Sequence, residues 1–252
     1  GQPESPLGER GGTSMKIEIL YPEICNLFGD MGNMQYLQHC LPDAEWFPTT
    51  FGTEPYFAAE TPDLIYMGST SERNQEKIIT QLRPYRVRLQ ELIASGVPML
   101  FTGNAGEILF TEIENWDGRK IPGLDLLPFT AKRSQYTRYN GLVLGSFQEK
   151  FDTLGFQSTF TSWYGDNSSC PFVRCQKGRG LNADSHLEGI VQEHLMVTSQ
   201  LGPILVNNPD LTRYLLDTMG AADSPVAFEK EIREAYAVRM QEFQNPKTKF
   251  AL

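Results

Sequence analysis

A glycine-bearing turn is the first feature of this sequence that could do chemistry. The segment MLFTGNAGEILF reads as the end of a buried strand, a tight turn with Gly103 at its apex, and an apolar helix that starts at Glu107. In an α/β protein, such a turn exposes a nucleophile at the carboxyl end of a strand. Neither a cysteine nor a serine stands at this apex, so the group that would react has to be sought elsewhere.

The cysteines and histidines are the first alternatives, because they most often serve as nucleophile and base. The four cysteines are Cys25, Cys40, Cys170 and Cys175. None of them lies at a strand-to-helix turn. Cys170 and Cys175 have no second pair with a histidine partner nearby, as a metal site would need. We therefore expect buried, reduced thiols and neither a metal nor a cofactor.

Alternating strand and helix patterns predict the elements that would position the turn. Strands are expected at 16–21, 45–51, 64–67 and 97–102, and helices at 33–40 and 72–94. This order implies right-handed crossovers and a mostly parallel sheet flanked by helices.

The pattern changes after residue 120. The stretch TAKRSQYTRYNGLVLG and residues 153–161 and 187–195 predict an antiparallel extension, followed by helices at 209–220 and 226–243. One domain is expected over 15–220. Residues 221–252 are expected to form a helix and a frayed end packed on that domain. Residues 1–14 are rich in Gly, Pro and Ser, and read as a tag remnant or a disordered tail.

Composition excludes several classes of function. The net charge is −9 and the isoelectric point is about 4.9, which argues against nucleic acid or an anionic membrane as the main partner. No apolar run approaches the length of a membrane span, and the first residues lack the apolar region of a signal peptide. The sequence therefore predicts a cytoplasmic protein.

Three stretches together resemble a known family. They are LYPEICNLFGDMGNMQYL at 20–37, YMGSTSERNQEKI at 66–78 and LEGIVQEHLMVTSQLGPILVNNPDLTRYLL at 187–216. They resemble the first strand and loop, the glycine-rich turn, and the last strand with its Gly-Pro turn in the cobyric-acid-synthase-type class I glutamine amidotransferases. The closest branch is the amidotransferase subunit of lipid II isoglutaminyl synthase. The resemblance covers nearly all of 15–220 and implies a flavodoxin-like α/β fold.

Members of this family take ammonia from glutamine with a cysteine thiolate at the elbow and a histidine on the late turn. By this resemblance the nucleophile position falls on Gly103 and the base position on Leu201, so both chemical groups are replaced. Thr102 is a strand residue that is expected to point into the protein. His194 lies at an odd offset from Leu201 and is expected on the opposite face. We therefore predict no glutaminase activity.

A pocket is still expected where the two glycine-bearing turns meet. Gly68-Ser69-Thr70 and Gly103-Asn104-Ala105 should lie side by side at the carboxyl ends of adjacent strands, with backbone N–H groups that suit a carboxylate. The alternative is that both are ordinary turns in which glycine and asparagine adopt a positive φ. By resemblance, Arg138 corresponds to an arginine near the substrate, or else is a surface arginine, and Gln157 lies on a second loop lining the pocket. The predicted pocket residues are Gly68, Ser69, Thr70, Asn104, Ala105, Arg138 and Gln157.

Two functional hypotheses follow from the resemblance. In the first, the chain is a pseudoenzyme: a non-catalytic subunit that supports a Mur-ligase-like, ATP-using partner in amidating a peptidoglycan precursor, or that senses a small carboxylate. In the second, it is an active glutamine-dependent amidotransferase in peptidoglycan precursor or cobyric acid (cobalamin) amidation, with its nucleophile at another position.

Overall fold

A six-stranded sheet forms the centre of the molecule in the computed structural model, which describes residues 14–252. Its strands, in spatial order, are β13 (Ile190–Gln192), β14 (Leu195–Thr198), β4 (Met99–Thr102), β3 (Leu64–Met67), β1 (Lys16–Leu20) and β2 (Glu45–Thr49). Only β13 runs antiparallel to its neighbour. The predicted α/β fold with a mostly parallel sheet is confirmed, and the carboxyl ends of β3, β4 and β14 lie next to one another.

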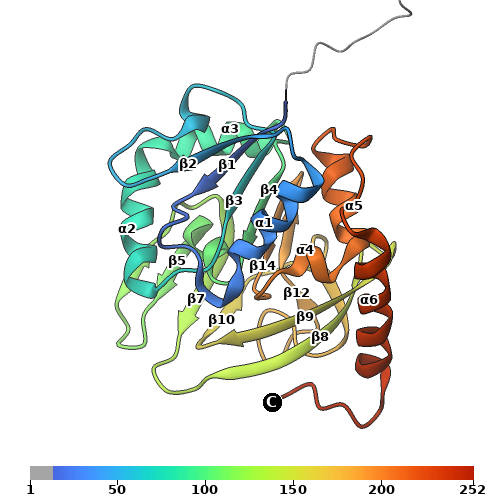
Figure 1. Ribbon diagram of the computed structural model, residues 1–252. Coiled ribbons are helices and arrows are strands. Elements are labelled where there is room, and N and C mark those ends of the chain that lie inside the picture. Colours follow the sequence, from blue (N-terminus) through green and yellow to red (C-terminus); the bar gives the residue numbers. More distant parts are fainter. Residues whose placement is uncertain (1–13) are drawn as a thin grey trace, which may run out of the picture.

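Helices cover both faces of this sheet (Figure 1). One face carries α1 (Met31–Cys40), α4 (Ile204–Asn207) and α5 (Pro209–Thr218), and the other carries α2 (Glu72–Leu82) and α3 (Arg86–Ala94). Side chains alternate along each buried strand. In β3, Ile65 and Met67 pack in one hydrophobic cluster, whereas Leu64 and Tyr66 pack in the other.

Two helix predictions are wrong. The single helix expected over 72–94 is divided by a 3-10 turn at Arg83–Tyr85, because Pro84 lacks the N–H that would continue the hydrogen-bond ladder. The helix expected from Glu107 is only a 3-10 segment, Ala105–Leu109, and β5 (Phe110–Glu114) begins directly after it. The segment after Leu109 is a strand and not a helix because β5 pairs with two further strands. Local periodicity does not reveal this pairing.

The predicted antiparallel extension consists of two four-stranded sheets. The first has the order β10 (Thr161–Tyr164), β7 (Leu127–Arg133), β5 and β6 (Lys120–Pro122). The second has the order β12 (Leu187–Glu188), β11 (Val173–Lys177), β8 (Tyr139–Phe147) and β9 (Phe151–Thr159). All neighbouring strands are antiparallel except β5 and β7. In Figure 1 the long strands β8 and β9 cross the lower part of the molecule.

The C-terminal segment is ordered against this extension. The helix α6 (Glu229–Gln244) packs on α4, α5 and β9. The chain end, expected to be frayed, forms a bridge between Ala251 and Gly141 of β8, and Phe250 accepts a hydrogen bond from the amide of Leu142 at 2.8 Å. Phe250 also packs edge-on against Phe243. The prediction of a frayed end is therefore wrong, because a distant strand pairs with this segment.

Residues 1–13, most of the predicted tail, lie outside the described residues. Within the described part of the chain, none of the helices has the length and apolar character needed to cross a membrane.

Candidate functional site

The turn after β4 has the backbone geometry of a nucleophile elbow. Gly103 adopts a φ of +63°, a conformation that side-chain-bearing residues rarely adopt. Its N–H donates to the carbonyl of Gln200, which ties the elbow to the turn after β14. The predicted turn is thus present at the carboxyl edge of the sheet, where α/β proteins place their sites.

The space above Gly103 is filled by other residues. A Cβ atom built on Gly103 would lie 1.6 Å from Oγ of Ser69 and 2.8 Å from Cδ2 of Leu201. Both distances are far below van der Waals contact. Ser69, Gly103 and Leu201, which belong to three different turns, therefore pack closely against one another at the elbow.

The two glycine-bearing turns are interlocked, as expected from their adjacent strands. The amide of Thr70 donates to Oδ1 of Asn104 at 3.0 Å, and Nδ2 of Asn104 donates to the carbonyl of Thr70 at 2.7 Å. The amide of Ser69 donates to Asp30 at 2.8 Å. The N–H groups of Ser69, Thr70 and Gly103 therefore already have partners within the protein. The expectation that they cradle a carboxylate is wrong for these three residues.

Asp30 joins the ends of three strands, and the sequence analysis did not single it out. One carboxylate oxygen accepts from the amide of Ser69 and, at 3.1 Å, from the hydroxyl of Thr102; the other accepts from the amide of Gly202 at 3.0 Å. The side chain is fully buried, and burial raises its pKa. Thr102 points into the protein, as predicted. Asp30 lies in the GDMGN stretch that carried part of the resemblance, so a signal for it was present.

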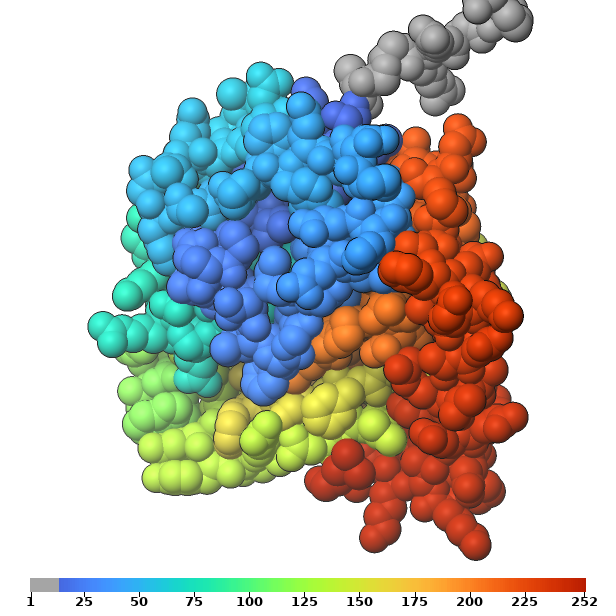
Figure 2. Space-filling model, in the orientation of Figure 1, coloured from blue at the N-terminus to red at the C-terminus, as the bar shows by residue number. Residues whose placement is uncertain are grey.

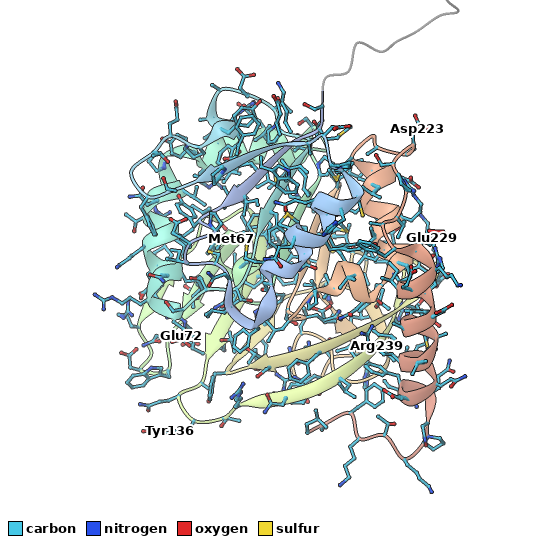
Figure 3. All side chains as sticks on the ribbon, in the orientation of Figure 1. Met67, Glu72, Tyr136, Asp223, Glu229 and Arg239 are labelled. Carbon is cyan, nitrogen blue, oxygen red and sulfur yellow. The ribbon has the colours of Figure 1, made fainter. Side chains whose placement is uncertain are left out.

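A cavity of about 200 Å³ opens beside the elbow. Its walls include Ser69, Gly103, Asn104, Glu107, Gln157 and Leu201. In Figure 2 the blue segment that leads into α1 borders the yellow-green segment of β8 and β9 on this side of the molecule. Glu72, at the start of α2, also lines the cavity, and Figure 3 shows it on the side away from α6. The cavity thus lies between the central sheet and the antiparallel extension.

Glu107 is a buried carboxyl group in the wall of this cavity. Its two oxygens accept from Nε2 of Gln75 at 2.9 Å and from Nε1 of Trp163 at 2.8 Å. Burial outweighs these hydrogen bonds and raises the pKa of Glu107 to about 7. In the sequence Glu107 stands only at a predicted helix start, because its burial depends on the distant elements β10 and α2.

Gln157 lines the cavity as predicted, although it lies on strand β9 and not on a loop. Its Nε2 donates to Oγ of Ser199 at 2.8 Å, and Ser199 donates in turn to the buried carboxylate of Glu188 at 3.0 Å. Among residues 14–252, no group donates a hydrogen bond to Oε1 of Gln157, which is buried. This amide oxygen is therefore a buried acceptor without a hydrogen-bond donor among the described residues.

Thr70 also lines the cavity as predicted, whereas the predicted residues Arg138, Ala105 and Gly68 are not part of its wall. Arg138 is exposed and lies directly before β8. Its Nε donates a hydrogen bond to Oγ of Ser158 at 2.9 Å. Ala105 is fully buried, and Gly68 packs against the carbonyl of Cys25. No pattern in the sequence pointed to Arg179, which lines the cavity from the loop after β11.

The described residues that line the cavity include no cysteine and no histidine. Burial raises the pKa of both Cys25 and Cys175 to about 12, and it also raises the pKa of Cys40. The imidazole of His194 contacts the carbonyl of Gly96 at 2.8 Å. His194 directly precedes the amino end of β14, so it lies at the edge of the sheet opposite the elbow. Within residues 14–252, no group of three or more His, Cys, Asp or Glu side chains is arranged to hold a metal ion.

Comparison with known proteins adds a sequence relative and two similar structures. The chain is 29% identical over 156 residues to the lipid II isoglutaminyl synthase (glutamine-hydrolyzing) subunit GatD of Staphylococcus aureus (strain N315). The match spans 62% of this chain and 63% of that relative. No family model matches the chain.

Two of the similar solved structures are glutamine amidotransferases. One, from Thermotoga maritima, has a TM-score of 0.53 and 11% identity and covers 90% of this chain and 94% of its own. Another has a TM-score of 0.53 and 15% identity and covers 81% of this chain and 98% of its own. The chain therefore has the glutamine amidotransferase fold, and over the matched residues its sequence is similar to GatD.

Proposed function

We propose that this chain is a GatD-like, non-catalytic amidotransferase subunit that has kept the fold and a ligand cavity and has lost glutamine hydrolysis. The observation that carries the proposal is the mutual packing of Ser69, Gly103 and Leu201. A thioester mechanism needs a nucleophile side chain at the elbow and a base beside it. Here the volume that a nucleophile's Cβ would occupy is taken by the Ser69 hydroxyl.

The chemistry of the cavity wall also supports a non-catalytic role. Its hydroxyl-bearing residues include Ser69 and Ser199, but a serine needs an adjacent base to become a nucleophile. Ser199 donates its hydroxyl proton to Glu188, which is itself buried among several donors. The hydroxyl of Ser69 contacts the carbonyl of Thr102 at 3.5 Å, and the Ser69 side chain also hydrogen-bonds to the buried carboxyl group of Asp30. No histidine lies among the described residues that line the cavity, so neither serine has an imidazole base beside it there.

The role that we propose for such a subunit is to support a Mur-ligase-like, ATP-using partner that amidates a peptidoglycan precursor, and to bind a small ligand in the cavity. Sequence similarity to GatD, whose name describes a subunit of lipid II isoglutaminyl synthase, supports this choice.

The direct test measures glutamate release from glutamine by the purified chain, alone and with its Mur-ligase-like partner. We expect no release above the uncatalysed rate in either case. Turnover that is abolished by replacing one of the four cysteines with alanine would contradict the proposal and favour an active amidotransferase.

Restoring the elbow tests why the chemistry is absent. In Gly103→Cys/Leu201→His, Ser69 still occupies the space of the new Cβ, so we expect little reaction of the introduced thiol with a glutamine-like electrophile. Adding Ser69→Gly should open that space and speed the labelling by at least about tenfold, which corresponds to about 1.4 kcal/mol in barrier height.

The matched control for the introduced thiol is Gly118→Cys. Gly118 also has a positive φ, but nothing lies within 4 Å of a Cβ built there. Its labelling should be unaffected by Ser69→Gly. Equal labelling of the double and triple variants would show that packing by Ser69 does not block the elbow.

A further inference from the structure

Residues 245–252, which we call the C-terminal strap, lie along one edge of strand β8. The chain turns back from the end of α6 toward β8 (Figure 1). The amide of Leu142 donates to the carbonyl of Phe250, and the amide of Leu252 donates to the carbonyl of Asn140, both at 2.8 Å. Strand β11 pairs with the second half of β8 on this edge, so the strap covers the first half.

Lys177 connects the strap to the loop after β11. Its ammonium group donates to the carbonyl of Phe243, in the last turn of α6, at 2.9 Å and lies over the ring of Phe250, 5.4 Å from the ring centre. The face of an aromatic ring attracts such a cation. Gly178 follows with a φ of +94°, and a Cβ built on it would lie 2.3 Å from the carbonyl oxygen of Leu142. The loop therefore begins in close contact with the part of β8 that carries the strap.

This loop forms part of the cavity wall. Arg179, Gly180 and Leu181 line the cavity. The guanidinium of Arg179 lies 3.9 Å from the ring centre of Tyr139, the first residue of β8. The amides of Gly180 and Leu181 donate to backbone carbonyl groups at 2.6 and 3.0 Å. The wall is thus connected to β8 through Arg179 and to the strap through Lys177.

The end of the strap is held by weak contacts. Its contacts with β8 include the two backbone hydrogen bonds, while Phe250 is half-buried and 68% of the Leu252 surface is exposed. Segments that bury little apolar surface open at a lower cost in free energy than the core. The strap can therefore separate from β8 while the central sheet stays folded.

We propose that the C-terminal strap is a releasable regulatory element that controls the 178–181 wall of the cavity through Lys177. With the strap on β8, Lys177 is fixed between the Phe250 ring and the end of α6, and the loop after it is ordered. When the strap separates, Lys177 loses its aromatic contact and the loop gains freedom. Coupling between two parts of a protein is reciprocal, so an ordered loop also favours the docked strap. This control does not depend on whether glutamine is hydrolysed.

Hydrogen exchange of the full chain tests the control from the side of the strap. Leu252→Pro removes the N–H that donates to Asn140, whereas Leu252→Ala shortens an exposed side chain and keeps this N–H. We expect the amides of Gly180 and Leu181 to exchange at least about tenfold faster in Leu252→Pro than in Leu252→Ala, because the loop opens more often. The amide of Met99 in β4 is the internal reference and should exchange equally in both variants.

Variants of Lys177 test the connection itself. Lys177→Met removes the charge and the donor and should speed the exchange of the same two loop amides, whereas Lys177→Arg keeps both and should resemble the parent. Lys150→Met is the matched control, since Lys150 also lies 5.4 Å from the centre of an aromatic ring, that of Tyr214, but at the β8–β9 turn. Circular dichroism should confirm that every variant is folded.

Three results would overturn the proposal. The first is unchanged exchange at Gly180 and Leu181 in Leu252→Pro. The second is faster exchange in only one of Leu252→Pro and Lys177→Met, because the strap would then not act through Lys177. The third is equal acceleration at Met99, which would show a general loss of stability and no specific control of the loop.

Discussion

Single residues explain how the elbow of this chain is packed. Ser69, Gly103 and Leu201 belong to three different turns and meet at one point. A change at one of them would leave a void or a clash, whereas the three together form a packed contact. Asp30 lies beneath them and accepts hydrogen bonds from Ser69, Thr102 and Gly202. The arrangement of the three turns therefore depends on the buried carboxyl group of Asp30.

Asp30→Asn tests this structural role. One oxygen becomes an amide that faces a backbone N–H, so at least one buried donor loses its acceptor. We expect the free energy of unfolding to fall by about 1–3 kcal/mol. Urea denaturation measures the change, and Asp43→Asn, an exposed aspartate, serves as the control. Equal stability of the two variants would contradict a role for Asp30 in joining the turns.

At the scale of elements, the site is built where the parallel sheet meets the antiparallel extension. Strands β3, β4 and β14 supply the turns, while β9 and β10 supply Gln157 and Trp163. The extension is itself completed by the chain end, which pairs with β8 next to β9. A segment that looks like a loose tail is thus part of the structure on which one wall of the cavity depends.

Phe250→Ala tests the contribution of this segment. Phe250 is half-buried against Phe243, so its loss should lower the free energy of unfolding by about 1–2 kcal/mol, less than a fully buried phenylalanine. Hydrogen exchange at the amide of Leu142, which donates to Phe250, should become faster. Lys249→Ala, at an exposed neighbour, should change neither quantity.

The whole molecule carries buried carboxyl groups whose protonation couples to folding. Burial raises the pKa of Glu107 from 4.5 to about 7 and that of Glu18 from 4.5 to about 6. Between the ordinary pKa of 4.5 and these raised values, the two carboxyl groups are protonated in the folded protein and ionised in the unfolded chain. The free energy of unfolding should therefore be highest at acidic pH and fall as pH rises through these values.

Glu107→Gln should remove much of this pH dependence. In the parent protein, Glu107 alone should lower the free energy of unfolding by about 3 kcal/mol between about pH 4.5 and 8, because each pKa unit corresponds to about 1.4 kcal/mol. Urea denaturation across this range should give a flatter profile for Glu107→Gln, most clearly above pH 6. In Glu18→Gln the flattening should be confined to lower pH. An unchanged slope in Glu107→Gln would contradict the proton coupling.

The sequence by itself determined the parallel sheet, most of its strands and the turn at Gly103, whereas the replacement of both family positions stays a prediction from the resemblance. These features depend on periodicity, glycine and aligned motifs, which are local properties of the chain. The sequence also predicted that Gln157 lines the pocket, although it placed Gln157 on a loop and not on a strand.

Only the tertiary structure decided what surrounds the elbow. Asp30, Glu107 and Arg179 are ordinary charged residues in the sequence, and their roles come from burial and from partners up to 172 residues away. The contact between Ser69, Gly103 and Leu201 likewise joins three distant turns. Such contacts depend on how the sheets pack, and a residue's local pattern carries no information about which distant groups it will meet.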